Sequence, residues 1–561
     1  MTDRKFHPPD DGRTALLHEA LHLPLWQLSP RQQCDIELLM NGAFAPLDGF
    51  LGKADYRQVL SDMRLADGNL WPIPVTLDVT PQFAEPLSPG DRITLRDEEN
   101  FALAVMTVKD IWKPDLRRES EAVYGTLNES HPGAHYLLHS SHSIYLGGRL
   151  EKISLPHHVD YPRHRHTPAQ LKQLFRDKGW SRIVAFQTRN PMHRAHIELT
   201  LKAMRDADAG LLIHPVVGIT QINDIDYHTR VHCYRAVMDE YPPDSAAMSL
   251  LPLAMRMAGP REALWHGLIR KNHGCTHFII GRDHAGPRKG SRGESFYRPF
   301  EAQELFVRHA GEIGIEPVAF GEIAYDPGKR EYTFAGDAGA SSGQLLSISG
   351  TKMREMLAGG EELPEWFTPP KVAKVLRRTY PPLKERGFTV FFTGLSGAGK
   401  TTLAKMLVTK LLEQGERQVT LLDGDIVRTN LSSELGFSKE HRSINVRRIG
   451  FVASEITKNG GIAICAPIAP YEADRRANRR LISRYGIYIE VYVSTPLKVC
   501  EERDVKGFYR SARQNLTKSF TGISDPYETP TNPEIAVDTS EETPEELVNR
   551  IYQKIRETGC L

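Results

Sequence analysis

Residues 388–401 read FTVFFTGLSGAGKT and are the most informative segment of this 561-residue chain. The first five residues predict a buried strand, and Leu403, Leu407 and Leu411 predict the apolar face of a helix that ends before Gly415. Between them lies the complete pattern GxxxxGK[ST], whose glycines let backbone N–H groups point at phosphate oxygens. We therefore expect a nucleotide phosphate loop formed by Gly394, Leu395, Ser396, Gly397, Ala398, Gly399, Lys400, Thr401 and Thr402.

Two carboxylates arrive beside this loop. The next predicted strand, residues 419–422, ends in Asp423-Gly424-Asp425, at the edge of the sheet where the loop also lies. Lys400 is the predicted catalytic cation, and the Thr401 hydroxyl and Asp423 suit the Mg²⁺ that accompanies ATP. We expect Asp425 to orient or deprotonate the acceptor hydroxyl. An exchange of roles between the two aspartates stays open, as does a simple Asp-Gly turn.

The acceptor is expected to be a nucleotide. Arg428, Phe437, Arg442, Asn445 and Arg447 follow the two aspartates closely in the chain. Guanidinium pairing and aromatic stacking suit an anionic aromatic ligand.

Four further segments carry a resemblance over about residues 388–560: LDGDIVRTNLSSELGFSKEHRSINVRRI, APIAPYEADRR, VKGFYRSAR and FTGISDPYETP. They resemble the adenylylsulfate kinases, which phosphorylate the 3′-hydroxyl of adenosine 5′-phosphosulfate. Ala469 stands where many members carry a serine that has been considered a phosphoenzyme site, so we expect direct in-line transfer. The resemblance implies that adenylylsulfate is held by Asp425, Arg428, Phe437, Arg442, Asn445 and Ile468, with Lys506, Phe508 and Phe520 in the lid and stacking region.

Strand and helix signals alternate from about residue 166. SRIVAFQ (181–187), LLIHPVVG (211–218) and THFIIG (276–281) predict a parallel sheet with a ligand site at the carboxyl ends of its strands. The first strand runs into QTRNPMHRAH (187–196), where we expect a helix from Pro191 capped by Asn190. His193 and His196 would share a face beside Arg189 as an anion cradle. A zinc site and ordinary packing are the alternatives, although spacing places no third zinc ligand nearby.

This block resembles ATP sulfurylase, which adenylylates sulfate and releases pyrophosphate. The similarity covers nearly all of residues 15–380, and its motifs are IELLMNGAFAPLDGFL (36–51), IHPVVG (213–218), LPLAMRMAGPREA (251–263), GRDHAGP (281–287) and ISGTKMREML (348–357). It implies in-line attack of sulfate on the α-phosphorus, catalysed by positioning and by charges facing the pyrophosphate. The resemblance implies that Gln187, Arg189 and Ala285 bind sulfate, and that Thr188 and Asn190 help to position ATP. It implies that His193 and His196 stabilise the phosphates, that Arg256 supports the reacting region and that Arg354 closes on phosphate. The implied nucleotide contacts are Gln187, Gly281, Arg282, Asp283, His284 and Ile323.

One departure weakens the expectation of sulfurylase turnover. Relatives joined in this order often read Lys-Pro-Gly-Asp where this chain has Gln221-Ile222-Asn223-Asp224. A phosphate-facing lysine is thereby lost, and cationic contacts to pyrophosphate stabilise the transition state.

The remaining features define a multidomain α/β protein. We expect a mainly β, PUA-like domain at residues 1–165, a Rossmann-like nucleotidyltransferase domain with linker at 166–385 and a P-loop kinase domain at 386–561. The net charge of +1 argues against wholesale binding to nucleic acid or an anionic membrane. Six cysteines without zinc spacing and no signal-like apolar segment indicate a cytoplasmic protein with reduced thiols. We also expect a homo-oligomer, from dimer to hexamer.

Three functions remain in competition. The leading hypothesis is a bifunctional enzyme that binds ATP, sulfate and adenylylsulfate, in which the kinase removes the product of an unfavourable first step. The second is an active kinase on a silent sulfurylase-like scaffold. The third is a sulfurylase regulated by a kinase-like nucleotide-binding domain, against which the intact Gly399-Lys400-Thr401 argues.

Overall fold

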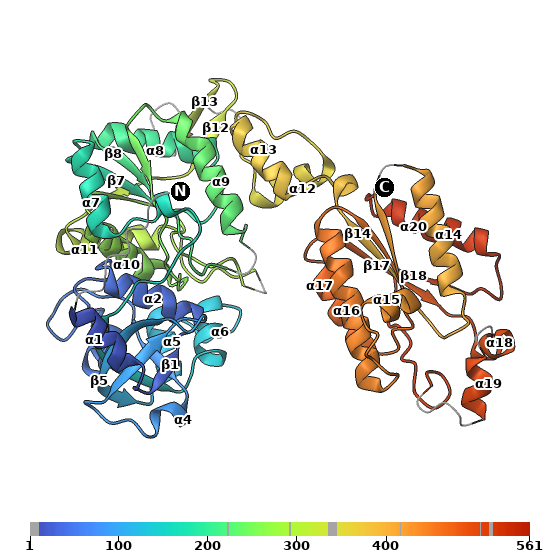
Figure 1. The fold of residues 1–561 in the computed structure, drawn as a ribbon. Coiled ribbons are helices and arrows are strands. Elements are labelled where there is room, and N and C mark those ends of the chain that lie inside the picture. The colour runs from blue at the N-terminus through green and yellow to red at the C-terminus, as the bar shows by residue number, and fades with distance from the viewer. Residues whose placement is uncertain are drawn as a thin grey trace. The chain divides into compact units, whose positions relative to one another are not determined.

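The computed structural model describes residues 11–221, 224–290, 293–334, 345–415, 417–504, 507–514 and 520–561. The chain divides into two compact units, Met1–Ser349 with Leu363–Leu376, and Gly350–Glu362 with Arg377–Leu561. The first unit holds an N-terminal domain and a middle domain, and the second holds the C-terminal domain (Figure 1). Within the described ranges, no helix has the length and apolar character that crossing a membrane requires.

A mixed sheet organises the N-terminal domain. Its order is β1-β4-β5-β6-β2, with β3 also paired to β6; β1 runs parallel to β4 and the other pairs are antiparallel. Its core is continuous with apolar residues of the middle domain, including the fully buried Trp265. The elements are α1 (Asp11–Ala20), β1 (Leu25–Gln27), α2 (Pro30–Met40), β2 (Gly49–Phe50), α3 (Lys53–Asp62), β3 (Leu77–Val79), α4 (Pro81–Ala84), β4 (Arg92–Arg96), β5 (Ala102–Trp112), α5 (Leu116–Tyr124), α6 (Pro132–His139) and β6 (Ile144–Lys152).

The middle domain is built on a parallel sheet of order β11-β10-β7-β8-β9. The chain leaves β7 toward β8 on one side and later returns to β10 on the other, so β7 and β10 flank the point where the strand order reverses. Ligands bind in open α/β sheets at such a point. The elements are α7 (Pro168–Asp177), β7 (Ile183–Phe186), α8 (Arg194–Ala207), β8 (Gly210–Ile213), α9 (Tyr227–Val237), β9 (Ala246–Met248), α10 (Gly259–Asn272), β10 (His277–Ile280), α11 (Glu301–Ile313), β11 (Glu316–Ala319) and the hairpin β12 (Ile323–Asp326) with β13 (Glu331–Phe334).

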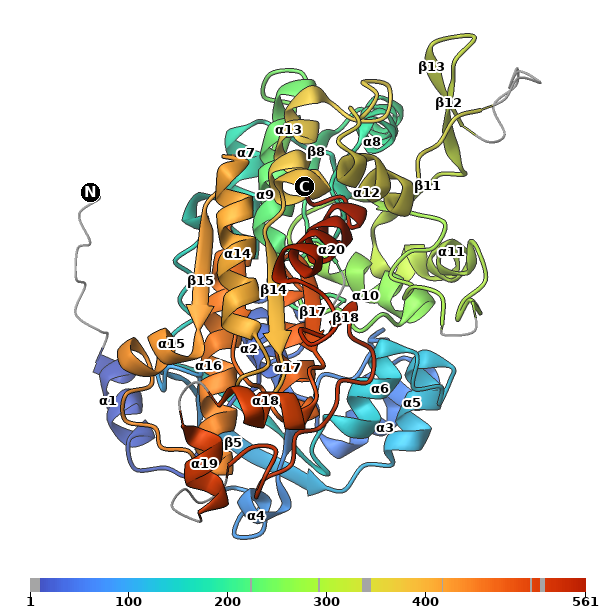
Figure 2. The same ribbon diagram turned by 90° about the vertical axis from the view of Figure 1, so that its right-hand side faces the viewer.

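The C-terminal domain contains a second parallel sheet, of order β15-β16-β14-β17-β18. Along β14, Phe388, Val390 and Phe392 pack into one apolar cluster and Phe391 packs into another on the opposite face, as the alternation of strand side chains requires. Figure 2 shows α14 and α20 on one face of this sheet. The elements of the second unit are α12 (Gly350–Gly359), β14 (Phe388–Thr393), α14 (Lys400–Glu413), β15 (Val419–Asp423), α15 (Gly424–Asn430), α16 (Lys439–Lys458), β16 (Ile462–Ala466), α17 (Glu472–Ile482), β17 (Ile487–Val493), α18 (Leu497–Arg503), α19 (Phe508–Arg513), β18 (Ile535–Val537) and α20 (Pro544–Glu557). Helix α13 (Pro370–Thr379) lies mainly in the first unit.

Candidate active sites

The loop between β14 and α14 has the backbone that a phosphate loop needs. Gly394 and Gly399 have φ values of +148° and +99°, which side chains rarely permit. A Cβ at Gly394 would also lie 2.5 Å from the carbonyl oxygen of Val493. Lys400 begins α14 and donates across the loop to the carbonyl oxygen of Leu395 at 2.7 Å. The N-terminal N–H groups of α14 therefore face the space enclosed by the loop.

Thr401 and Asp423 meet at the edge of this loop. The Thr401 hydroxyl donates to Asp423 Oδ2 at 2.7 Å, and Asp423 Oδ1 accepts the backbone N–H of Asp425 at 3.0 Å. Asp423 is buried at the start of α15, whereas Asp425 is exposed. A hydroxyl and a carboxylate are hard oxygen ligands, so this pair fits Mg²⁺. The roles of the two aspartates stay predictions.

The residues expected to bind adenylylsulfate divide into exposed and engaged side chains. The Arg428 guanidinium lies 4.4 Å from the centroid of the Phe437 ring, which is 62% exposed. Arg442 is buried; it donates to Tyr471 Oη at 2.9 Å and forms an ion pair with Asp525. Asn445 is also buried, Phe508 and Phe520 are ring neighbours at 6.4 Å, and Lys506 lies outside the described residues.

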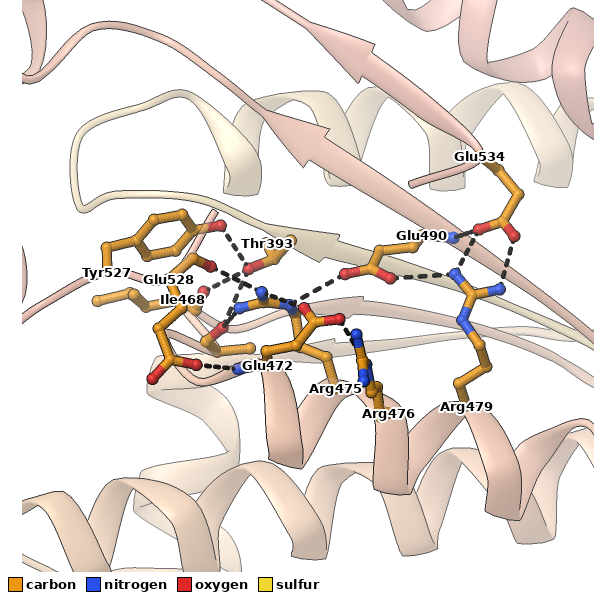
Figure 3. A network of polar contacts seen from close by, with 11 residues as sticks. Thr393, Ile468, Glu472, Arg475, Arg476, Arg479, Glu490, Tyr527, Glu528 and Glu534 are labelled. Carbon is orange, nitrogen blue, oxygen red and sulfur yellow. Dashed lines mark hydrogen bonds and ion pairs between the residues drawn. The ribbon is translucent and has the colours of Figure 1, made fainter. Parts of the chain in front are cut away.

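A buried network holds the turn that contains Ile468 and Ala469 (Figure 3). Thr393 Oγ1 donates to the carbonyl oxygen of Ile468 at 2.7 Å, and the Arg475 guanidinium donates to that of Ala469 at 2.7 Å. Arg475 also donates to the Glu528 carbonyl at 2.7 Å and pairs with Glu472 and Glu490. Ala469 has φ of +46°, an uncommon conformation for a side-chain-bearing residue. The network therefore fixes a strained turn next to the phosphate loop.

The second site forms where β7 and β10 end in the middle domain. Gln187, Thr188, Arg189 and Asn190 follow β7, as the motif predicted. Thr188 is buried and donates to the carbonyl oxygen of Asn190 at 3.0 Å. Asn190 itself is exposed.

The prediction that Asn190 caps a helix beginning at Pro191 is wrong. α8 begins at Arg194, with His193 as its N-cap. His196, the third residue of the helix, accepts the backbone N–H of His193 on its Nδ1 at 3.1 Å. Burial lowers the pKa of His193 to about 3 and that of His196 to about 4. At neutral pH both rings are therefore neutral hydrogen-bonding groups, so the positive charge of the predicted anion cradle would come from Arg189 and the helix dipole.

The loop after β10 approaches the same place. The Arg189 guanidinium donates to the Gly286 carbonyl at 3.0 Å, and this bond connects the loop after β7 to the loop after β10. The same guanidinium lies 3.4 Å from the Asp224 carboxylate. His284 and Ala285 are partly buried there, and Ala285 has φ of +53°. Gly281, Arg282 and Asp283 are exposed, and Arg282 pairs with Asp283 and Glu322. Arg189 thus contacts the loop that carries His284 and Ala285, and Gln187 and His284 both contact His266; the ligand roles of these residues stay predictions.

Three expected residues have other surroundings. Arg256 is 2% exposed, and its guanidinium donates to Asp35 at 2.6 Å and to the Ala254 carbonyl at 2.7 Å, so it joins the N-terminal and middle domains, and its supporting role stays a prediction. Ile323 begins β12 and is partly buried. Arg354 lies in α12, which belongs to the second unit.

Several residues that make polar contacts at this site were not predicted from the sequence. His193 Nδ1 lies 3.0 Å from Thr368 Oγ1, and Glu262 and His266 form a buried pair on α10 at 3.3 Å. A glutamate and a histidine four residues apart in a helix that is buried nearly all round were the available signal for the second pair.

Comparisons with known proteins match all three domains. The PUA-like domain model matches residues 4–155, the ATP-sulfurylase model 162–379 and the adenylylsulphate kinase model 386–538. A sulfate adenylyltransferase from Phaeosphaeria nodorum is 49% identical over 98% of this chain and 96% of that protein. One from Emericella nidulans is 49% identical over 96% and 95%. A solved structure described as hexameric APS kinase from Thiobacillus denitrificans has a TM-score of 0.80 and 38% identity, and covers 98% of this chain and 96% of that one.

Fold and sites together define a nucleotidyltransferase domain joined to a P-loop kinase domain. More particularly, the chain belongs to the sulfate adenylyltransferase family, with a PUA-like domain, an ATP-sulfurylase domain and a C-terminal adenylylsulphate kinase domain.

Proposed function

We propose that this protein activates sulfate in two steps. In the first, an oxygen of sulfate attacks the α-phosphorus of ATP, and pyrophosphate leaves as adenylylsulfate forms. In the second, the 3′-hydroxyl of adenylylsulfate attacks the γ-phosphorus of another ATP, ADP leaves, and 3′-phosphoadenylylsulfate forms. The observation that carries the kinase assignment is the intact loop, in which Lys400 donates to the carbonyl oxygen of Leu395 and Thr401 donates to Asp423.

In the first step the protein supplies position and charge. Gln187 and Arg189 would hold sulfate, while the neutral rings of His193 and His196 would donate hydrogen bonds to the phosphates. The connection of Arg189 to Gly286 keeps its guanidinium beside Ala285. The pKa of Arg189 is lowered by burial, yet Asp224 favours its cationic form.

In the second step Lys400 and the N–H groups of the loop bind the transferred phosphate. Thr401 and Asp423 would hold Mg²⁺, which neutralises phosphate charge when bound. Asp425 is the proposed acceptor of the 3′-hydroxyl proton, and its exposure leaves it open to substrate. Arg428, Phe437, Arg442, Asn445 and Ile468 would hold the adenylylsulfate.

Two assays on the purified protein test this proposal. One measures sulfate-dependent pyrophosphate release from ATP, and the other measures adenylylsulfate-dependent ADP formation. The proposal expects both activities in the full chain. ADP formation alone supports the silent-scaffold alternative, and pyrophosphate release alone supports a regulatory kinase-like domain.

We also propose that the protein works as a homo-oligomer, since the similar Thiobacillus denitrificans protein is described as hexameric. Light scattering coupled to size-exclusion chromatography measures this directly. A monomer at micromolar concentration would contradict it.

A further inference from the structure

A chain of buried polar groups leads from α10 to the loop after β10. Glu262 is fully buried, and its carboxylate accepts the backbone N–H groups of Arg256 at 2.9 Å and Ala258 at 2.8 Å. His266, also fully buried, places Nε2 3.3 Å from Glu262 Oε1. On the other side of its ring, Nδ1 lies 3.0 Å from Nε2 of His284.

These contacts fix where each proton lies. Burial alone would raise the pKa of Glu262, but His266 and the two backbone donors outweigh it and leave that pKa below its ordinary value. The ionised carboxylate can only accept, so His266 Nε2 carries a hydrogen. Burial lowers the pKa values of His266 and His284, so each ring is neutral. His266 Nδ1 is therefore the acceptor for the Nε2–H of His284.

The proton on His266 Nε2 decides how the Gln187 side-chain amide is oriented. Its Nε2 lies 3.5 Å from His266 Nε2, which places two donors face to face. Its Oε1 is buried and accepts no hydrogen bond from any residue that the structure describes. The oxygen and nitrogen of an amide have nearly the same shape, so a half-turn about the last bond exchanges them without moving the backbone. After that turn Gln187 Oε1 shares the His266 Nε2–H with Glu262 Oε1 as a three-centre hydrogen bond, and the NH₂ group occupies the unpartnered position.

We propose that His266, held in one tautomer by Glu262, is a positioning residue that turns the N–H groups of Gln187 toward the oxyanion of the substrate. The inference rests on the proposed sulfurylase function of this site. Arg189, two residues further on, is tied through Gly286 to the loop that His266 holds through His284. One cation and two amide donors are thus fixed beside one another. The neutral ring of His266 keeps the negative charge of Glu262 away from sulfate.

Two substitutions at one position separate this role from simple packing. His266→Gln places an amide nitrogen near the original Nε2 and keeps a donor for Gln187, whereas His266→Asn places its amide near Nδ1 and loses that donor. We expect His266→Asn to raise the KM for sulfate about tenfold or more, with the KM for ATP changed less than about twofold, and His266→Gln to stay within about threefold of wild type. The matched control is His273→Asn, because His273 is buried at the end of the same helix and its Nδ1 contacts only the Ile269 carbonyl at 2.8 Å among described hydrogen-bond partners. It should leave both KM values unchanged.

A binding measurement keeps this inference separate from the proposed turnover. Sodium sulfate is titrated calorimetrically into the full chain saturated with α,β-methylene ATP. Sulfate binding that His266→Asn weakens and His266→Gln preserves supports the positioning role even if wild type releases no pyrophosphate. Equal behaviour of the two variants, or equal effects on the KM values for ATP and sulfate, overturns it while the proposed function stands. Absence of both binding and turnover in wild type overturns both.

Discussion

Arg475 offers a direct test of the buried network in the C-terminal domain. We consider Arg475→Met, which keeps an unbranched chain of similar length but removes the guanidinium. That side chain is 1% exposed and donates to the carbonyl oxygens of Ala469 and Glu528, each at 2.7 Å, and to Glu472 at 2.6 Å. Its Nε also forms an ion pair with Glu490 at 3.1 Å. Removal of the guanidinium leaves the buried carbonyl of Ala469 and the carbonyl of the exposed Glu528 without this donor.

The expected cost follows from which partners remain paired. Removing one member of a buried ion pair costs about 3–5 kcal/mol because the other charge stays buried. Glu490 keeps Arg479 at 3.0 Å, and Glu472 keeps Arg476 at 2.8 Å, so the lower end of that range applies. With about 2–4 °C per kcal/mol for a domain of this size, the melting temperature of the second unit should fall by about 6–12 °C.

Differential scanning calorimetry of the full chain measures this shift. Arg476→Met is the matched control: its side chain is 64% exposed and its pair with Glu472 should contribute less than about 1 kcal/mol. The KM for adenylylsulfate should also rise in Arg475→Met, because the turn carrying Ile468 loses its anchor at Ala469, while pyrophosphate release stays unchanged. A melting shift below about 2 °C, or one no larger than that of the control, would refute the reasoning.

Three further outcomes are expected. Lys400→Ala should lower adenylylsulfate-dependent ADP formation by about a hundredfold while pyrophosphate release persists, and kinase turnover within tenfold of wild type would contradict the phosphate-loop assignment. Because Ala469 has no hydroxyl, denatured protein should retain no phosphate label after incubation with ATP alone, and a retained label would argue for a covalent intermediate. His196→Ala should lower kcat for pyrophosphate release by about a hundredfold; if wild type instead lacks this activity, restoring Lys-Pro-Gly at 221–223 should create it, and continued silence would place the defect elsewhere.

A fourth outcome concerns pH. Burial lowers the pKa of His193 to about 3 and that of His196 to about 4, below the ordinary value of about 6.5 that the unfolded chain retains. The unfolded chain therefore binds more protons below pH about 6.5, so the first unit should lose stability as the pH falls from there toward about 4. Melting temperatures measured across this range should decline less steeply in His196→Gln. An identical slope would mean that His196 is protonated in the folded protein.

The sequence alone determined most of what depends on neighbouring residues. The phosphate loop is contiguous, and its glycines, lysine and threonine perform their roles within one turn, so their pattern predicted both the strand β14 and the helix α14. The parallel sheets likewise followed from alternating strand and helix signals. The motif at 187–196 predicted the position of the second site at the end of β7.

The tertiary structure decided what depends on contacts between distant segments. Spacing suggested an Asn190 cap, but the His196 imidazole could reach the His193 N–H and so set the helix start. Arg256 was expected to support the reacting region, and only folding shows that Asp35 from the N-terminal domain pairs with its buried guanidinium. No role for Glu262 and His266 was predicted from the sequence. The hydrogen bonds that join them to Gln187 and His284 depend on burial and on atoms that only folding brings together.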